Sequence, residues 1–135
     1  MKSVVAMLAV DTDFVVRYLV KDDASQSARA RHIVQSAPIF VSPTVVLECD
    51  WVLRSLYGFS RRQALGALEA FCGTPNVNVG EAAAVKRALR LAELGLDFAD
   101  ALHLAQAKDC EAFATFDRRL ARRAKGLIDT PVRLA

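Results

Sequence analysis

The sequence predicts an α/β fold with a mostly parallel sheet. Short apolar runs alternate along the chain with longer segments of helical periodicity, the pattern of strands joined by helices. The chain has 135 residues and is 53% hydrophobic, which is enough for one compact core and too little for two ordinary domains. No repeat, low-complexity segment or linker interrupts the pattern, so we expect a single domain over residues 1–135.

The strands are assigned to short apolar runs bounded by acids, prolines or glycines. They are expected at Val4–Val10, Ile39–Val41, Val77–Val79, Ala112–Phe116 and, at an edge, Val132–Leu134. The first run is apolar enough for a fully buried strand, and it stops abruptly at Asp11. A strand that ends in this way places its acid at the C-terminal edge of the sheet, where open α/β folds bind ligands.

The helices are assigned to apolar residues that recur at helical spacing between capping residues. They are expected at Phe14–Val20, Ser25–Ser36, Pro43–Tyr57, Ser60–Gly73, Glu81–Leu94, from Asp97 or Phe98 to Lys108, and in a short basic stretch after Asp117. Thr12 and Asp13 can cap the first helix, and Pro43 suits a first turn because its missing N–H costs nothing there. The apolar side of the third predicted helix, Pro43–Tyr57, is assigned to Val45, Val46, Trp51, Val52, Leu53 and Leu56.

Charge and cysteine content set the broad class of protein. The net charge of +3 is mild, but basic residues gather in two groups that fit a solvated helix face and a phosphate-contacting surface equally well. These are Arg118, Arg119, Arg122, Arg123 and Lys125 in one group, and Arg54, Arg61 and Arg62 in the other. The three cysteines are an odd number at wide spacings, which indicates a reducing compartment. With no zinc-type spacing, signal peptide or membrane span, we expect a cytoplasmic protein without membrane contact.

Four acids stand in apolar surroundings. Asp11 and Asp117 each follow a predicted strand, while Glu48 and Asp100 lie early in predicted helices, so a parallel sheet can bring all four to one edge. Each also has a structural explanation: Asp11 and Asp117 can cap helices, Glu48 can be a solvated helix residue, and Asp100 can cap a helix or pair with an arginine. The joint pattern is more specific than any one of these acids.

A divalent cation is the natural partner for such a set of acids. Burying an anion is costly unless it is paired, and the chain offers no matching set of basic residues on the apolar faces. Mg²⁺ or Mn²⁺ prefers carboxylate oxygens, retains waters and can bridge a phosphate. Such a centre can activate water and stabilise the leaving oxygen in phosphodiester cleavage.

Four segments of the chain resemble the PIN domain, in particular the VapC toxins of bacterial type II toxin–antitoxin modules. They are L-A-V-D-T-D at 8–13, P-T-V-V-L-E at 43–48, D-F-A-D-A-L-H-L-A at 97–105 and F-A-T-F-D at 113–117, and the resemblance extends over essentially the whole chain. It implies a PIN-like three-layer α/β/α sandwich and a ribonuclease dependent on Mg²⁺ or Mn²⁺, which leaves a 5′-phosphate and a 3′-hydroxyl.

The resemblance also implies roles for individual residues. Asp11, Glu48, Asp100 and Asp117 become the catalytic and metal-binding acids. Asp11 and Asp100 are the expected direct ligands, and the other two act through water or complete a second ion site. Thr12 and Thr115 match small hydroxyl positions that support the acids, and Asp97 matches a frequent acidic position. Asp13 departs from the family pattern, which often has Asn or Ser there, and either strengthens metal binding or only caps the helix.

His103 follows Asp100 by one helical turn, on the same side of the predicted helix. It can act as a general base or phosphate contact, or simply be a packed or surface residue.

The partners implied by the resemblance are an RNA substrate of unspecified kind, a VapB-like antitoxin and a second copy of the chain. The helices around Trp51–Phe59 and Leu65–Phe71 are candidates for the antitoxin's docking surface, although core packing explains them equally well. Two other functions fit less well. A non-catalytic RNA- or protein-binding PIN-like module would typically lack one of the acids. A haloacid dehalogenase-like phosphatase, suggested by D-T-D at 11–13, would need a further lysine and acidic motif.

Overall fold

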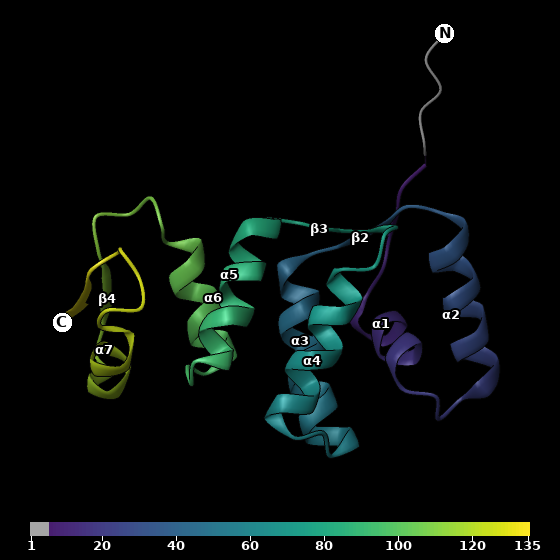
Figure 1. The fold of residues 1–135 in the computed structure, drawn as a ribbon, viewed down its shortest axis with the longest axis horizontal. Coiled ribbons are helices and arrows are strands. Elements are labelled where there is room, and N and C mark those ends of the chain that lie inside the picture. Colours follow the sequence, from purple (N-terminus) through teal and green to yellow (C-terminus); the bar gives the residue numbers. More distant parts are fainter. Residues whose placement is uncertain (1–5) are drawn as a thin grey trace, which may run out of the picture. The chain divides into compact units, whose positions relative to one another are not determined.

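A computed structural model of the chain describes residues 6–135 and divides into two compact units, with the boundary between Ala82 and Ala83. Each unit is described by itself. The first contains two helices between its first two strands and two more before its third strand (Figure 1). Its elements are β1 (Leu8–Ala9), α1 (Thr12–Leu19), α2 (Ala24–Ser36), β2 (Ile39–Val41), α3 (Pro43–Tyr57), α4 (Arg61–Cys72) and β3 (Val77–Val79).

The strands of the first unit pair in parallel, in the order β1-β2-β3. Leu8 is in register with Ile39, and Ile39 in turn with Val77. Because parallel strands share one direction, their carboxyl ends lie at the same edge of the sheet, and there β1 leads into Asp11 and α1. The core of the unit includes Val15, Val16, Val34, Ile39, Val41, Val46, Leu53, Leu68 and Phe71.

The first strand differs from the prediction. The strand is Leu8–Ala9 rather than Val4–Val10, and both of its residues are exposed, so the expectation of a fully buried strand is wrong for them. The physical reason is that β1 lies at the edge of its unit's sheet, where a strand has a neighbour on one side only. Val4 and Val5 lie outside the described residues.

The third helix has the predicted bounds but a different buried face. Val46, Cys49, Asp50 and Leu53 are its buried residues, spaced three and four apart as one face of a helix requires. Trp51 and Leu56, which were assigned to the apolar side, lie off that face and are exposed. Figure 1 shows α3 and α4 together, and on α4 the apolar residues Leu65, Leu68 and Phe71 are buried.

The second unit consists of α5 (Ala82–Glu93, which begins at the boundary), α6 (Phe98–Gln106), β4 (Phe113–Thr115), α7 (Arg118–Ala124) and β5 (Val132–Leu134). Its two strands also pair in parallel, so the predicted mixture of helices and parallel strands is confirmed, with the strands in two sheets. Apolar residues at helical spacing are buried on both helices, among them Val85, Ala88, Leu89 and Ala92 on α5 and Leu102 and Ala105 on α6. No helix among residues 6–135 combines the length and the apolar character that crossing a membrane requires.

Candidate functional site

Asp11 ends the first strand segment and caps the helix that follows. Its side chain accepts a hydrogen bond from the backbone N–H of Phe14 at 2.9 Å, so Asp11, and not Thr12 or Asp13, is the cap of α1. The residue is exposed all the same. A capping carboxylate uses one oxygen lone pair for this bond and keeps acceptor capacity for a ligand, so the capping role and a metal-binding role are compatible.

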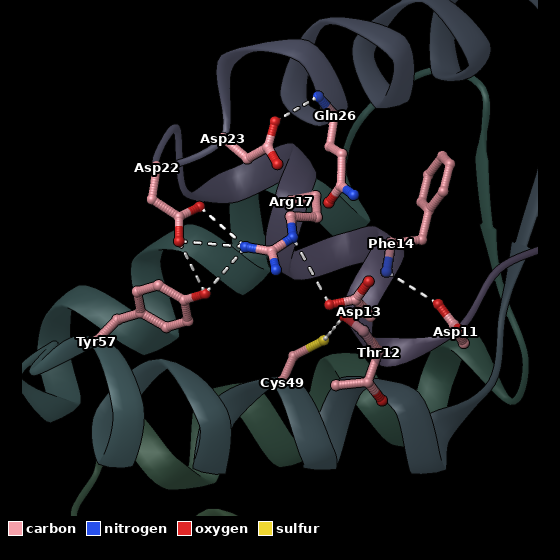
Figure 2. A network of polar contacts seen from close by, with 10 residues as sticks. All are labelled: Asp11, Thr12, Asp13, Phe14, Arg17, Asp22, Asp23, Gln26, Cys49 and Tyr57. Carbon is pink, nitrogen blue, oxygen red and sulfur yellow. Dashed lines mark hydrogen bonds and ion pairs between the residues drawn. The ribbon is translucent and has the colours of Figure 1, made fainter.

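Glu48 lies on α3 and is connected to the start of α1 through Thr12, the residue that follows Asp11. The hydroxyl of Thr12 donates to Glu48 Oε1 at 2.7 Å. The buried thiol of Cys49 in turn donates to the backbone carbonyl of Thr12 at 3.9 Å, which places Thr12 close over α3 (Figure 2). The start of α1 is thus joined to α3 from both sides of one threonine, and two of the predicted acids belong to one local group.

Negative charge also acts on Cys49 in this group. Burial, together with the smaller effects of the negative groups of Cys72, Glu48, Asp11 and Asp50, raises the pKa of the Cys49 thiol to about 12. Cys49 is therefore a neutral thiol at physiological pH, which fits its role as a hydrogen-bond donor to Thr12 rather than as a nucleophile or metal ligand.

The second unit brings together the other two predicted acids. Asp100 lies in the first turn of α6, and Asp97 caps that helix by accepting from the backbone N–H of Asp100 at 3.4 Å. Desolvation, followed by the negative charges of Asp97 and Asp117, raises the pKa of Asp100, while His103 acts in the opposite direction. Asp97 and Asp117 therefore both act on Asp100, and the opposite effect of His103 does not outweigh burial and these two charges.

Asp117 caps α7 at the end of β4. One of its carboxylate oxygens accepts from the backbone N–H groups of Arg119 at 2.9 Å and Leu120 at 3.0 Å. Its own backbone N–H donates to the Thr115 hydroxyl at 3.0 Å. The capping explanation is again correct, and the second carboxylate oxygen is available for another partner.

The donor set fits a hard divalent cation. Asp11, Glu48, Asp97, Asp100 and Asp117 are all carboxylates, which are the ligands that Mg²⁺ and Mn²⁺ prefer. In the second unit, burial and then the negative charges of Asp97 and Asp117 raise the pKa of Asp100, and a bound cation would stabilise its ionised form. Within residues 6–135, no three His, Cys, Asp or Glu side chains already form a group that could hold a metal ion. The Asp11–Glu48 pair and the Asp97–Asp100–Asp117 group belong to different units.

Sequence reasoning missed two polar arrangements in the first unit. Asp50 is buried on α3 and is bound by the guanidinium of Arg54, at 2.7 and 3.2 Å. Arg17 donates to both oxygens of Asp22 at 3.1 and 3.2 Å and contacts the Tyr57 hydroxyl at 3.2 Å (Figure 2). The i, i+4 spacing of Asp50 and Arg54 was the only available signal, because Tyr57 is forty residues from Arg17.

Basic residues cover the outward side of the last helix. Leu120 and Ala124 are its buried residues, while Arg118, Arg119, Arg122 and Arg123 are exposed. Arg123 also donates to the backbone carbonyl of Gly95 at 3.2 Å. The helix starts at Asp117, so this basic surface begins directly beside one of the candidate acids.

Solved structures that are similar to this chain include the following two. One is VapBC2 from Rickettsia felis bound to a DNA fragment from its promoter, at 15% identity and a TM-score of 0.41, over 96% of this chain and 98% of that chain. The other is Mycobacterium tuberculosis VapC20, a sarcin–ricin loop cleaving toxin, at 21% identity and a TM-score of 0.43, over 93% and 98%. No curated protein matches.

The PIN domain family matches residues 8–126, which extends across both units and includes all four predicted acids. This match confirms the resemblance drawn from the four sequence segments, and with it the predicted fold class, a PIN-like α/β/α fold with parallel strands. The chain belongs to the PIN domain family.

Proposed function

We propose that this protein is a VapC-like endoribonuclease that depends on Mg²⁺ or Mn²⁺. The observation that carries the proposal is the position of Asp100 inside a PIN domain, where burial and the negative charges of Asp97 and Asp117 raise its pKa. Acids that serve only as helix caps need no such grouping. Repulsion among them is unfavourable in the folded protein and becomes useful when a cation binds.

The roles of the acids follow the sequence resemblance. Asp11 and Asp100 are the proposed direct ligands, and Glu48 and Asp117 act through water or complete a second ion site. When bound, a divalent cation supplies activation of water and stabilisation of the charge that develops on the leaving oxygen. The carboxylates hold that ion, and the Thr12 hydroxyl orients Glu48 through its 2.7 Å bond.

The substrate class follows from charge. The exposed arginines of α7 can bind phosphates of a nucleic acid that lies beside Asp117, and phosphate contacts dominate the affinity of such complexes. Arg61 and Arg62, exposed at the start of α4, are the second proposed phosphate-binding group. Ribonucleic acid is the substrate implied by the resemblance to VapC toxins.

The proposed partners are a VapB-like antitoxin and a second copy of the chain. Trp51 is 60% exposed and Leu56 is 69% exposed on α3, so they offer apolar surface for one of these contacts. The Leu65–Phe71 face, the other candidate for docking, belongs to the core instead.

We further propose that residues 1–135 work as one domain in the cytoplasm. Coincident thermal unfolding of Trp51 fluorescence and total helix content would support the single domain, and two separate transitions would oppose it.

The test is cleavage of a total small-RNA pool by the protein purified free of antitoxin. Reactions contain Mg²⁺, Mn²⁺ or EDTA and are compared with the Asp11→Asn/Asp100→Asn double variant. Discrete fragments that require the metal, carry 5′-phosphates and disappear in the double variant are expected. Metal-independent cleavage, or full activity in the double variant, would refute the assignment. RNA binding without cleavage would indicate the non-catalytic module instead.

A further inference from the structure

A hollow of about 300 Å³ lies between α1 and α2, next to Asp11. On α1 it is lined by Asp13, Phe14 and Arg17, and on α2 by Gln26 and Arg29. Figure 2 shows Gln26 extending from α2 towards Arg17, with the Phe14 ring alongside. The hollow therefore presents an aromatic ring, a carboxamide, carboxylates and guanidinium groups to a single occupant.

The two arginines that line this hollow differ in how many contacts hold their side chains. Arg17 is held by both oxygens of Asp22, by the Tyr57 hydroxyl and, at 3.7 Å, by Asp13. Its guanidinium is therefore a preorganised part of the wall. Arg29 is exposed and forms no hydrogen bond or ion pair with any residue that the structure describes. Arg29 thus keeps its full donor capacity for a ligand.

The side-chain amide oxygen of Gln26 also lacks a hydrogen-bond partner in the part of the chain that the structure describes. Its backbone N–H is bound by the cap of α2, Asp23, but its buried amide oxygen accepts no hydrogen bond within residues 6–135. A buried acceptor without a donor costs free energy that a ligand donor can recover. The unpaired amide and the unpaired guanidinium lie on the same face of α2, three residues apart, and both line the hollow.

We propose that this hollow binds one nucleotide of the RNA, beside the bond that is cut. Arg29 binds its phosphate, and Gln26 and Asp13 contact the edge of its base, with Phe14 as the apolar wall. The volume is at the lower end for small-molecule sites, which suits a single nucleotide rather than a peptide helix. Because Asp11 lines the same hollow, the nucleotide lies next to a proposed cleavage acid, and this inference rests on the proposed function.

The chemistry of Asp13 specifies which bases are preferred. An ionised carboxylate only accepts hydrogen bonds, so it favours guanine, whose N1–H and amino group can donate to its two oxygens together, over uracil and cytosine, which each present one donor on that edge. The side chain of Asp13 is 73% exposed, and one of its oxygens lies 3.7 Å from the guanidinium of Arg17. The hollow thus assigns Asp13 to recognition of the base and leaves the metal to other acids.

The first test is the sequencing of cleavage sites from a randomised RNA pool. Arg29→Ala is expected to raise KM about 10-fold with little change in kcat, as for the loss of a phosphate contact. Asp13→Ala is expected to reduce the preference for guanine over uracil at one position beside the cut about 10-fold. Arg90→Ala and Asp109→Ala, which replace exposed residues of the same types in the second unit, are the matched controls and should behave as wild type.

A second measurement separates failure of this inference from failure of the proposed function. Guanosine and uridine 5′-monophosphates are titrated into the ¹⁵N-labelled protein without metal. Shifts of the Asp13, Gln26 and Arg29 signals with the guanosine nucleotide, weaker with the uridine nucleotide and lost in Arg29→Ala, support the site even if no RNA is cut. Cleavage with unchanged KM and unchanged base preference in both variants would overturn the inference while the ribonuclease assignment stands.

Discussion

Two groups of acids in this chain are held in opposite ways. In the first unit, Asp22 is bound by Arg17 and Tyr57; these hydrogen bonds outweigh the effect of burial and keep the pKa of Asp22 below its usual value. In the second unit, burial and the charges of Asp97 and Asp117 raise the pKa of Asp100. The difference indicates which acids serve the fold and which need a partner from outside. A carboxylate that already has its cation is structural, and one surrounded by like charge is a candidate metal ligand.

The largest expected effect is on RNA cleavage when Asp100, the acid near like charges, is replaced. Asp100→Asn should lower metal-dependent RNA cleavage by at least about 100-fold, because loss of a direct ligand costs no less than loss of its supporting contacts. Asp109→Asn, an exposed acid in the same unit, is the control. Initial cleavage rates over a range of Mg²⁺ concentrations measure the effect. Equal losses in both variants would mean that total charge, and not position, matters.

Two substitutions of Asp117 separate its role as a helix cap from its proposed role as a metal-binding acid. Asparagine caps helices as well as aspartate does, so Asp117→Asn should keep the stability of α7 and lose about 10-fold or more in activity. Asp117→Ala should lose the activity and also about 1 kcal/mol of unfolding free energy. Thermal unfolding beside cleavage rates distinguishes the two. Full activity in Asp117→Asn would make this residue a cap only.

The link between Thr12 and Glu48 is expected to matter less than the acids themselves. Thr12→Val removes the hydroxyl that donates to Glu48 at nearly constant volume, and activity should fall about 10-fold. Thr12→Ser restores the donor and should recover most of the rate. Measured kcat for the three proteins tests this. A serine variant as impaired as the valine one would show that the methyl group, not the hydrogen bond, is what matters.

The smallest effect concerns stability and its dependence on pH. Because the pKa of Asp22 is lower in the folded protein than its usual 3.8, its contribution to stability is present above that value and is lost as pH falls through the folded pKa. Asp22→Asn should therefore lower the melting temperature at pH 7 by about 1–3 °C, with the difference vanishing in strongly acidic buffer. Asp100→Asn without metal should not lower it, because that change removes repulsion. Scanning calorimetry from pH 2 to 7 measures the melting temperatures of the two variants. If both melting temperatures changed with pH in the same way, Asp22 and Asp100 would not differ in their contribution to stability.

Local sequence signals predicted the order of elements well. Ser42, Pro43 and Gly58 specify the ends of α3 because caps act through bonds to neighbouring backbone groups. The four acids were also found from the sequence, because a charge at the end of an apolar run is visible without coordinates. Exposure was predicted less well. Trp51 and Leu56 are apolar but lie off the buried face of α3, and β1 is exposed at the edge of its unit's sheet.

The sequence by itself determined which residues can do chemistry here: the carboxylates, their positions at the ends of strands and helices, and the family. Tertiary structure decided how those residues are partnered. It joined Thr12 to Glu48, thirty-six residues away, set Tyr57 against Arg17, and placed Asp117 close enough to Asp100 to raise its pKa. It also formed the hollow beside Asp13 from two helices. The physical reason is that caps and periodicity depend on near neighbours in the chain, whereas pKa values, unpaired donors and cavities depend on contacts between residues far apart in it.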